Sequence, residues 1–292
     1  MPSIITLGSG SIKQYGHAHV LPPVAASGSF TFTTFTFSSP INAGTYQSGI
    51  NASRAELLGP TSAQLQTYYN SNNATLASML SAGTYFTVPY NGYQRFVIPS
   101  TGNYIINAQG GCGGQAIVAG ARGVNITATF ALTQGDVIWM AIGHSGTTTH
   151  TDNADWCSAG GGGATFVAKG SALASSVCLL CAAGGQGAWE PLRNSSSPVA
   201  SSSANGTSGA GFTSFKNQTI NGGYGGYAGY YGYGGFGGGG ASDDGSGPCG
   251  GYDALQTTSA NSWVDASGTT VTRINAGDNR LTLPGYVTIT AP

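Results

Sequence analysis

The sequence predicts an all-β fold, a sandwich or jelly roll of short antiparallel strands that also contains polyglycine II-like helices and one short helical stretch. Three observations favour it. Short segments that alternate apolar and polar residues recur along the chain, as in strands with one buried face. Glycine accounts for 49 of the 292 residues and collects in runs between these segments. Only 7% of the residues are charged, but 40% are hydrophobic and 10% aromatic, so a packed core is expected rather than disorder.

The beginning of the chain differs from the rest. Residues 1–27 have small side chains, two adjacent prolines and no periodicity, and we interpret them as an extended arm. The β domain is expected to span residues 28–292. Its first strand alternates phenylalanine with threonine, and the alternation slips at Thr33-Thr34, which indicates a bulge or a bend. The phenylalanines are Phe30, Phe32, Phe35 and Phe37.

One helical insertion is predicted near residues 60–82. Gly59-Pro60-Thr61 is typical of a helix start, and good helix formers follow as far as Tyr69. A second short helix is expected from Asn73 to just before Gly83. Apolar residues spaced by three and four in both segments predict one face that packs on a sheet.

The remaining strands are predicted from alternation or from short apolar runs that end at turn residues. They are Tyr93–Ile98, Asn103–Ala108, Val124–Leu132, Asp136–Ile142, Ala164–Ala168, Val177–Ala183 and Tyr286–Thr290. The first two flank Pro99-Ser100-Thr101-Gly102 and are expected to form a hairpin. Ala164–Ala168 and Val177–Ala183 are expected to form another strand pair.

A glycine-rich region between residues 108 and 251 has a period that fits neither a strand nor an α-helix. An aromatic residue recurs at every third position from Tyr224 onward, and glycine occupies nearly all positions between. These aromatic residues are Tyr224, Tyr227, Tyr230, Tyr233 and Phe236. A period of three is that of the polyproline II conformation, whose backbone groups must bond to neighbouring chains. We therefore predict polyglycine II helices here, with a flexible low-complexity segment as the alternative.

Composition also excludes some functions. The formal net charge is −1 and the nine basic residues are scattered, so nucleic-acid binding is not expected. No apolar run reaches the roughly 18 residues of a membrane span, and the N-terminus lacks the pattern of a secretory signal. Sparse carboxylates, no Gly-x-Ser-x-Gly motif and glycine runs without a phosphate-loop lysine predict that the protein is not an enzyme.

Two groups of residues could hold a metal. Cys178 and Cys181 form a C-x-x-C pattern, but in a strand residues three apart point to opposite faces, so we expect two buried apolar thiols. His17 and His19 alternate on the arm. In a trimer they would bring six imidazoles together around the axis, a site for a transition metal ion; the alternative is a polar arm. No other cofactor is expected.

The order of several motifs resembles a known domain. Tyr93–Tyr104 leads into Gly110–Gly114, and Gly135-Asp136-Val137, Gly160–Val167 and Leu179–Gly185 follow. The glycine and aromatic run and a closing Gly-Tyr-Val-Thr-Ile strand complete the series. Over residues 84–292 this series is similar to the glycine-rich domain of the anaplastic lymphoma kinase receptor family. The resemblance implies a TNF-like jelly roll with inserted polyglycine II helices.

A second resemblance concerns function. The opening Ile4–Gly16 and the stretch from Gly59 to Tyr69 look like segments of bacteriophage tail and fibre proteins. This similarity implies a homotrimeric fibre or fibre-tip subunit on the virion surface, attached to other virion proteins through the N-terminal arm. It would bind a glycan or protein on the host cell.

The candidates for receptor contact are aromatic residues, because rings stack on sugars and dominate binding energy. They are Trp156, Trp189, Tyr230, Tyr231, Tyr233 and Trp263. Core packing is the alternative for each. Two other functions stay open: a purely structural head-fibre, decoration or filament subunit and, third, a polysaccharide depolymerase.

Overall fold

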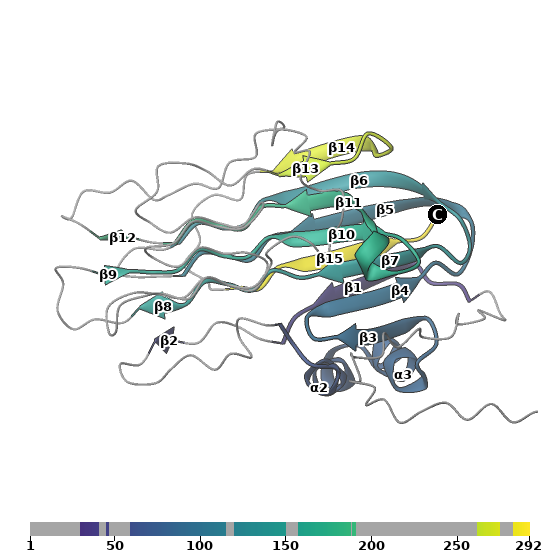
Figure 1. Ribbon diagram of the computed structural model, residues 1–292, viewed down its shortest axis with the longest axis horizontal. Helices are drawn as coiled ribbons and strands as arrows, with labels where there is room; N and C mark the ends of the chain where they lie inside the picture. Colours follow the sequence, from purple (N-terminus) through teal and green to yellow (C-terminus); the bar gives the residue numbers. More distant parts are fainter. Residues whose placement is uncertain are drawn as a thin grey trace, which may run out of the picture.

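Two antiparallel β-sheets lie face to face in the computed structural model, and glycine-rich segments extend from one end of them (Figure 1). This architecture confirms the all-β sandwich with a jelly-roll-like arrangement of strands. The described residues are 30–40, 45–46, 59–114, 120–149, 157–187, 189–190, 262–274 and 283–292. The N-terminal arm predicted over residues 1–27 lies outside them.

The first sheet has five strands and pairs the two ends of the described chain. Its order is β1 (Thr34–Ser38), β15 (Tyr286–Thr290), β5 (Gly102–Gln109), β6 (Asn125–Leu132) and β14 (Thr269–Ile274). In β1 the phenylalanines are buried and Thr34 and Thr36 are exposed, as the alternation predicts. Thr34 and Thr36 lie beside Thr290 and Thr288 of β15, with 3.2 Å between hydroxyl oxygens in each pair.

The second sheet has six strands. Its order is β13 (Trp263–Val264), β11 (Val177–Ala182), β10 (Thr165–Lys169), β7 (Val137–Ala141), β4 (Tyr93–Val97) and β3 (Phe86–Tyr90). A short 3-10 helix, η1 (Leu173–Ser175), joins β10 to β11. The predicted pairing of residues 164–168 with 177–183 is confirmed by the antiparallel register of β10 with β11.

The main core lies between the two sheets and is rich in aromatic rings. Phe37 of the first sheet contacts Phe96 and Phe86 of the second, with ring centroids 5.4 and 5.3 Å apart. Tyr104 is also buried, and its hydroxyl group donates to the carbonyl oxygen of Ser100 at 2.8 Å. Such rings bury large apolar areas, so they supply much of the driving force for closing the sandwich.

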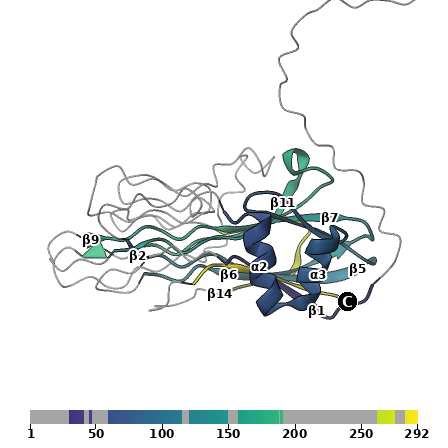
Figure 2. The same cartoon turned by 90° about the horizontal axis from the view of Figure 1, so that it is seen from below.

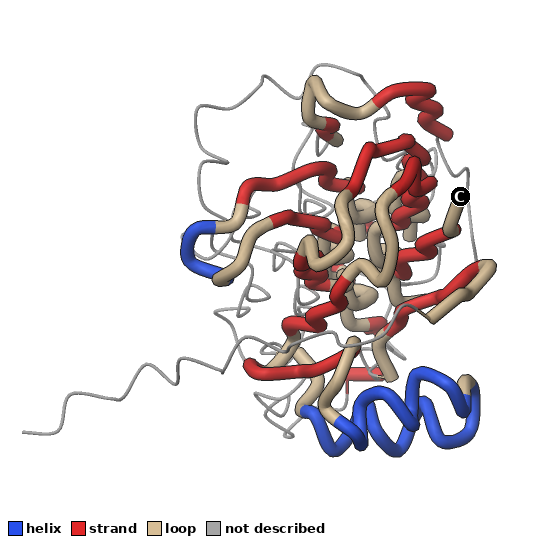
Figure 3. Tube along the Cα trace, turned by 90° about the vertical axis from the view of Figure 1, so that its right-hand side faces the viewer, coloured by secondary structure: helices blue, strands red, loops and turns tan. Residues whose placement is uncertain are grey.

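Two helices, α2 (Ser62–Asn72) and α3 (Ala74–Ala82), confirm the predicted insertion (Figures 2 and 3). Thr61 begins α2 with a capping box, since its hydroxyl group accepts from the Gln64 N–H and Gln64 accepts from the Thr61 N–H. Asn73 ends α2 and caps α3, and Gly83 ends α3 in the left-handed conformation. The apolar residues that the helices add to the core are Leu65, Tyr69, Leu76, Ala77 and Leu80.

The predicted hairpin around residues 99–102 is wrong. β4 pairs with β3 and β7, whereas β5 pairs with β15 and β6, so the connection crosses from one sheet to the other. The turn at Gln134-Gly135 makes the same crossing between β6 and β7. Backbone hydrogen bonds from Ile98 to Asp136 and from Gly135 to Ile98 join the two crossings. Proline and glycine mark a change of direction, but only the packing decides whether the next strand pairs with the last or faces it.

The argument that separated Cys178 from Cys181 is also wrong. Opposite β10, Val167 pairs with Leu180 but Ala168 pairs with Cys178, so Leu179 is the extra residue of a β-bulge. The bulge places both cysteines on the outer face of the second sheet, in a small apolar cluster with Trp139 and Phe166. Both cysteines are buried, as expected of small apolar residues.

Three strands of the two sheets were not predicted. β3 contains a proline, β13 is two residues long, and β14 is exposed along much of its length. None of them has the clean alternation of buried and exposed residues that identified the others.

Candidate binding surface

The glycine bundle is the group of extended segments that continues from the sandwich, residues 110–114, 120–124, 143–147, 159–163 and 184–187. Its backbone hydrogen bonds repeat every three residues. Gly111 donates to the carbonyl oxygen of Gly163 and Gly114 to that of Gly160, both at 2.8 Å. From the first bond to the second, the donor lies three residues later in its segment and the acceptor three residues earlier in the other. This is the pattern of antiparallel helices with about three residues per turn, as in the polyproline II conformation.

Other pairs of segments in the bundle follow the same rule. Gly110 and Gly113 donate to Val124 and Ala121, and Ala121 and Val124 in turn donate to Gln186 and Ala183. Residues 110–114 are central, because their N–H and C=O groups bond to the four other segments and to Leu283. The donors and acceptors of this backbone are thus satisfied between segments, as the polyglycine II interpretation requires.

Only glycine fits many of these positions. A methyl group added to Gly111 or Gly114 would overlap the carbonyl oxygen of His144 or Thr147, and one on Gly162 would overlap that of Gly111. Gly111 and Gly114 are three residues apart, and so are residues 144 and 147, which they would overlap. The glycine runs therefore permit backbones to approach at hydrogen-bonding distance along every side of the bundle.

The Tyr224–Gly240 run, from which polyglycine II helices were predicted, lies outside the described residues. The bundle that the structure describes is built by the shorter glycine runs of residues 110–187, inside the predicted region 108–251. The described glycine runs supply neighbours for one another, and polyglycine II packing of the Tyr224–Gly240 run itself stays a prediction.

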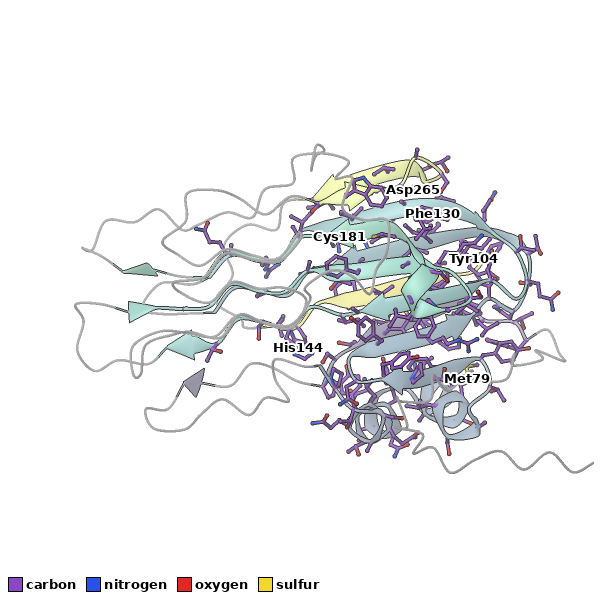
Figure 4. The ribbon with its side chains drawn as sticks, in the orientation of Figure 1. Met79, Tyr104, Phe130, His144, Cys181 and Asp265 are labelled. Carbon is purple, nitrogen blue, oxygen red and sulfur yellow. The ribbon has the colours of Figure 1, made fainter. Side chains whose placement is uncertain are left out.

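A buried polar contact ties the bundle to the sandwich. His144 lies where the bundle leaves the sheets (Figure 4), and its Nε2 atom is 2.7 Å from the hydroxyl oxygen of Ser39, directly after β1. Both residues are buried. Gly285, just before β15, donates to the carbonyl oxygen of Gly143. The bundle therefore continues the framework of both sheets.

The far end of the bundle carries two short strand pairs (Figure 1). β2 (Thr45–Tyr46) pairs with β8 (Thr148–Thr149) in parallel, and β9 (Cys157–Ser158) pairs with β12 (Trp189–Glu190) in antiparallel register. Trp189 thus belongs to this end, opposite Ser158. Trp156 directly precedes β9 but lies outside the described residues.

Of the other predicted site residues, Trp263 is described and lies on the sandwich. Trp263, in β13, is half-buried and packs against the outer-face cluster of Trp139, Phe166 and the two cysteines, as its core-packing alternative implies. The three candidate tyrosines and both arm histidines lie outside the described residues; they are Tyr230, Tyr231, Tyr233, His17 and His19. Within the described ranges, no group of three His, Cys, Asp or Glu side chains could hold a metal ion.

A second candidate site, not anticipated from the sequence, lies on the outer face of β3 and β4. We call Thr87 and Arg95 the donor cluster. They lie directly opposite each other on β3 and β4. The Thr87 hydroxyl and Arg95 Nη1 are buried and have no hydrogen-bond partner. In the part of the chain that is described, two other buried side-chain atoms have none, Nε of Arg122 and the hydroxyl of Tyr85, whose ring packs against Phe30 and the core between the sheets.

Aromatic residues border the donor cluster. The Arg95 guanidinium carbon lies 6.0 Å from the ring centroid of Trp139, the residue opposite it on β7. Tyr90 lies on the same side, 6.4 Å from Trp139 between ring centroids, and is 47% exposed. The Trp139 indole is fixed by a hydrogen bond to the carbonyl oxygen of Gly170 at 2.8 Å. Tyr93, opposite Tyr90, completes the border.

The electrostatics of this cluster are those of a site without a counterion. Arg95 is 9% exposed, and burial lowers its pKa from the ordinary value. A guanidinium group still remains protonated in proteins. Burial also raises the pKa of Tyr93 to about 12, so its hydroxyl group stays neutral at physiological pH. The one ion pair among the described residues joins Lys169 to Asp136 at 2.7 Å, and it does not include Arg95.

The sequence contains a weak signal for this site. Tyr93 and Arg95 alternate with the buried Gln94 and Phe96, which places them on the outer face. Their neighbours Thr87 and Trp139 come from other strands, and only the register brings the four together.

Comparison with known proteins gives one short similarity. No protein-family model matches the chain. Over 91 residues the chain is 30% identical to the leukocyte tyrosine kinase receptor of Mus musculus. The match covers 30% of this chain and 10% of the receptor. It supports a distant relation to that receptor family. No helix among the described residues is long and apolar enough to cross a membrane.

Proposed function

We propose that this protein is a non-catalytic recognition protein, a subunit of a bacteriophage tail fibre or fibre tip that binds the host cell surface. The observation that carries the proposal is the glycine bundle. It extends from the sandwich and carries two short strand pairs at its far end (Figure 1).

Such a bundle suits display more than catalysis. Its backbone groups are bonded to neighbouring segments and glycine fills its contacts, so it offers few side chains for chemistry. Binding residues concentrate on loops that a rigid scaffold positions. Trp189 in β12 lies at the far end, and tryptophan is enriched among residues that dominate binding energy. The resemblance to phage fibre segments adds the virion and a homotrimer to this proposal.

The test is binding by the purified full chain. We expect it to bind cells of a susceptible strain in a panel of bacterial hosts, and to block infection by phages of that strain. Trp189→Ala should weaken cell binding roughly tenfold or more, as expected for a binding hot spot. Trp263→Phe, on the sandwich, is the matched control and should bind normally. Mass measurement should give a trimer.

Two results would redirect the proposal. A folded protein that neither binds cells nor blocks infection would favour a purely structural head-fibre or decoration subunit. Degradation of a host polysaccharide by the purified protein would instead indicate a depolymerase.

A further inference from the structure

We propose that the donor cluster of Thr87 and Arg95, with its aromatic border, is a binding site for a carboxylate-bearing sugar, the uronic acid class. Nothing in this proposal depends on the fibre assignment, because the site lies on the sandwich and not at the far end of the bundle. It begins from the two buried polar atoms of this cluster that lack partners.

The first step concerns the energetic cost of these atoms. A buried polar atom without a partner destabilises the fold, and more so when it carries charge. Nearly all buried polar groups in folded proteins are therefore bonded. Two of the four exceptions in the described chain lie directly opposite each other, on Thr87 and Arg95. A shared ligand would satisfy both.

The second step concerns the chemistry of the ligand. Arg95 can only donate hydrogen bonds, and the Thr87 hydroxyl group can donate as well. No carboxylate of a described residue pairs with Arg95. The ligand must therefore bring acceptor oxygens and negative charge. A planar carboxylate matches the fork of a guanidinium group and can accept two parallel hydrogen bonds.

The third step concerns the body of the ligand. Tyr90 is 47% exposed and Tyr93 is half-buried, and the two face each other across β3 and β4 beside Trp139. Aromatic faces provide an apolar platform with a polar tip, which suits the apolar face of a sugar ring. β3 is the edge strand of its sheet, so the platform is open to solvent on one side. The guanidinium group of Arg95 lies over the ring of Trp139, which is 3% exposed.

The experiment uses the full-length protein and sodium glucuronate as the probe, with glucose as its neutral counterpart and inorganic phosphate as a simple anion. Binding is measured by calorimetry and by the rise in melting temperature, since a ligand that binds the native state stabilises it. We expect glucuronate to bind and to raise the melting temperature, with no effect of glucose and a weaker effect of phosphate.

Three variants define the residues. Arg95→Met should weaken glucuronate binding at least tenfold and should keep or raise the melting temperature without ligand, because an unpaired buried charge is replaced by an apolar chain of similar length. Thr87→Val, which removes one donor without changing shape, should weaken binding several-fold. Lys169→Met removes the same charge from a position outside the cluster, and its glucuronate affinity should equal that of the unaltered protein.

Each other outcome overturns the proposal. Phosphate binding as strong as glucuronate binding would mean a site for an inorganic anion only. No binding of glucuronate by the unaltered protein, or equal loss of binding in Lys169→Met and Arg95→Met, would remove the site. If Arg95→Met fails to fold, undiminished binding by Thr87→Val contradicts the cluster.

Discussion

The sandwich and the glycine bundle are continuous in space, but packed side chains stabilise the sandwich and backbone hydrogen bonds stabilise the bundle. In the sandwich, rings such as Phe37 and Phe96 fill the space between the sheets, and backbone bonds run within each layer. In the bundle, hydrogen bonds between backbones join the segments, and a single methyl group at Gly111 would not fit. The first region needs large side chains, and the second needs glycine at its closest contacts. One chain therefore alternates between runs rich in phenylalanine and isoleucine and runs of glycine.

The interactions in the two regions also differ in how strictly they depend on geometry. Burial of apolar area is non-directional and tolerates small shifts. Hydrogen bonds between helices with three residues per turn are directional, and each segment of the bundle requires its neighbours to satisfy its backbone. The bundle should form as a unit upon a sandwich that is already in place, since its root is held by Ser39, His144 and Gly285.

The largest expected effect is in the sandwich. Phe96→Ala should lower the free energy of unfolding by about 3–5 kcal/mol, because a buried ring is lost and a cavity remains. Urea denaturation followed by tryptophan fluorescence measures this change. Ile105→Ala, on the exposed side of β5, is the control and should change stability by roughly 0.5 kcal/mol or less. Similar losses for both variants would contradict a core that depends on these rings.

A smaller effect is expected in the bundle. Gly111→Ala should cost about 1–3 kcal/mol, since the added methyl group forces backbone segments apart. Hydrogen exchange should show faster exchange for the amides of residues 110–114 and 159–163, with the sandwich strands still protected. Gly83→Ala is the control, because nothing surrounds Gly83 and only its left-handed conformation opposes the change, at about 1 kcal/mol. Loss of protection throughout the sandwich in Gly111→Ala would show that the two regions unfold together.

The smallest effect is expected at the helical insertion, which lies outside the two sheets and the glycine bundle. Thr61→Ala removes the hydroxyl group that caps α2 and should cost about 1 kcal/mol. Thr61→Ser keeps the oxygen and should cost almost nothing. Thermal unfolding monitored by circular dichroism distinguishes the two. Equal melting temperatures for Thr61→Ala and Thr61→Ser would show that the cap contributes no stability.

Local patterns in the sequence predicted much of the fold, because each depends on neighbouring residues. Alternation gave β15 with its observed bounds and β6 to within one residue, and the Thr61 start signal gave α2. The glycine runs predicted a backbone with close neighbours. In contrast, β14 was missed, since an exposed edge strand has no buried face and therefore no alternation to detect.

Only the tertiary structure determined which segments, distant in the sequence, pair or pack with each other. The turns at residues 99–102 and 134–135 marked changes of direction, but packing of the two layers determined that both cross between sheets. One extra residue at Leu179 placed Cys178 and Cys181 on the same face, which strict alternation forbids. The same holds for the candidate sites. The sequence placed glycine where backbones must touch, because glycine alone permits it; the register placed Thr87, Arg95 and Trp139 side by side, because contacts between distant strands are set by the whole fold.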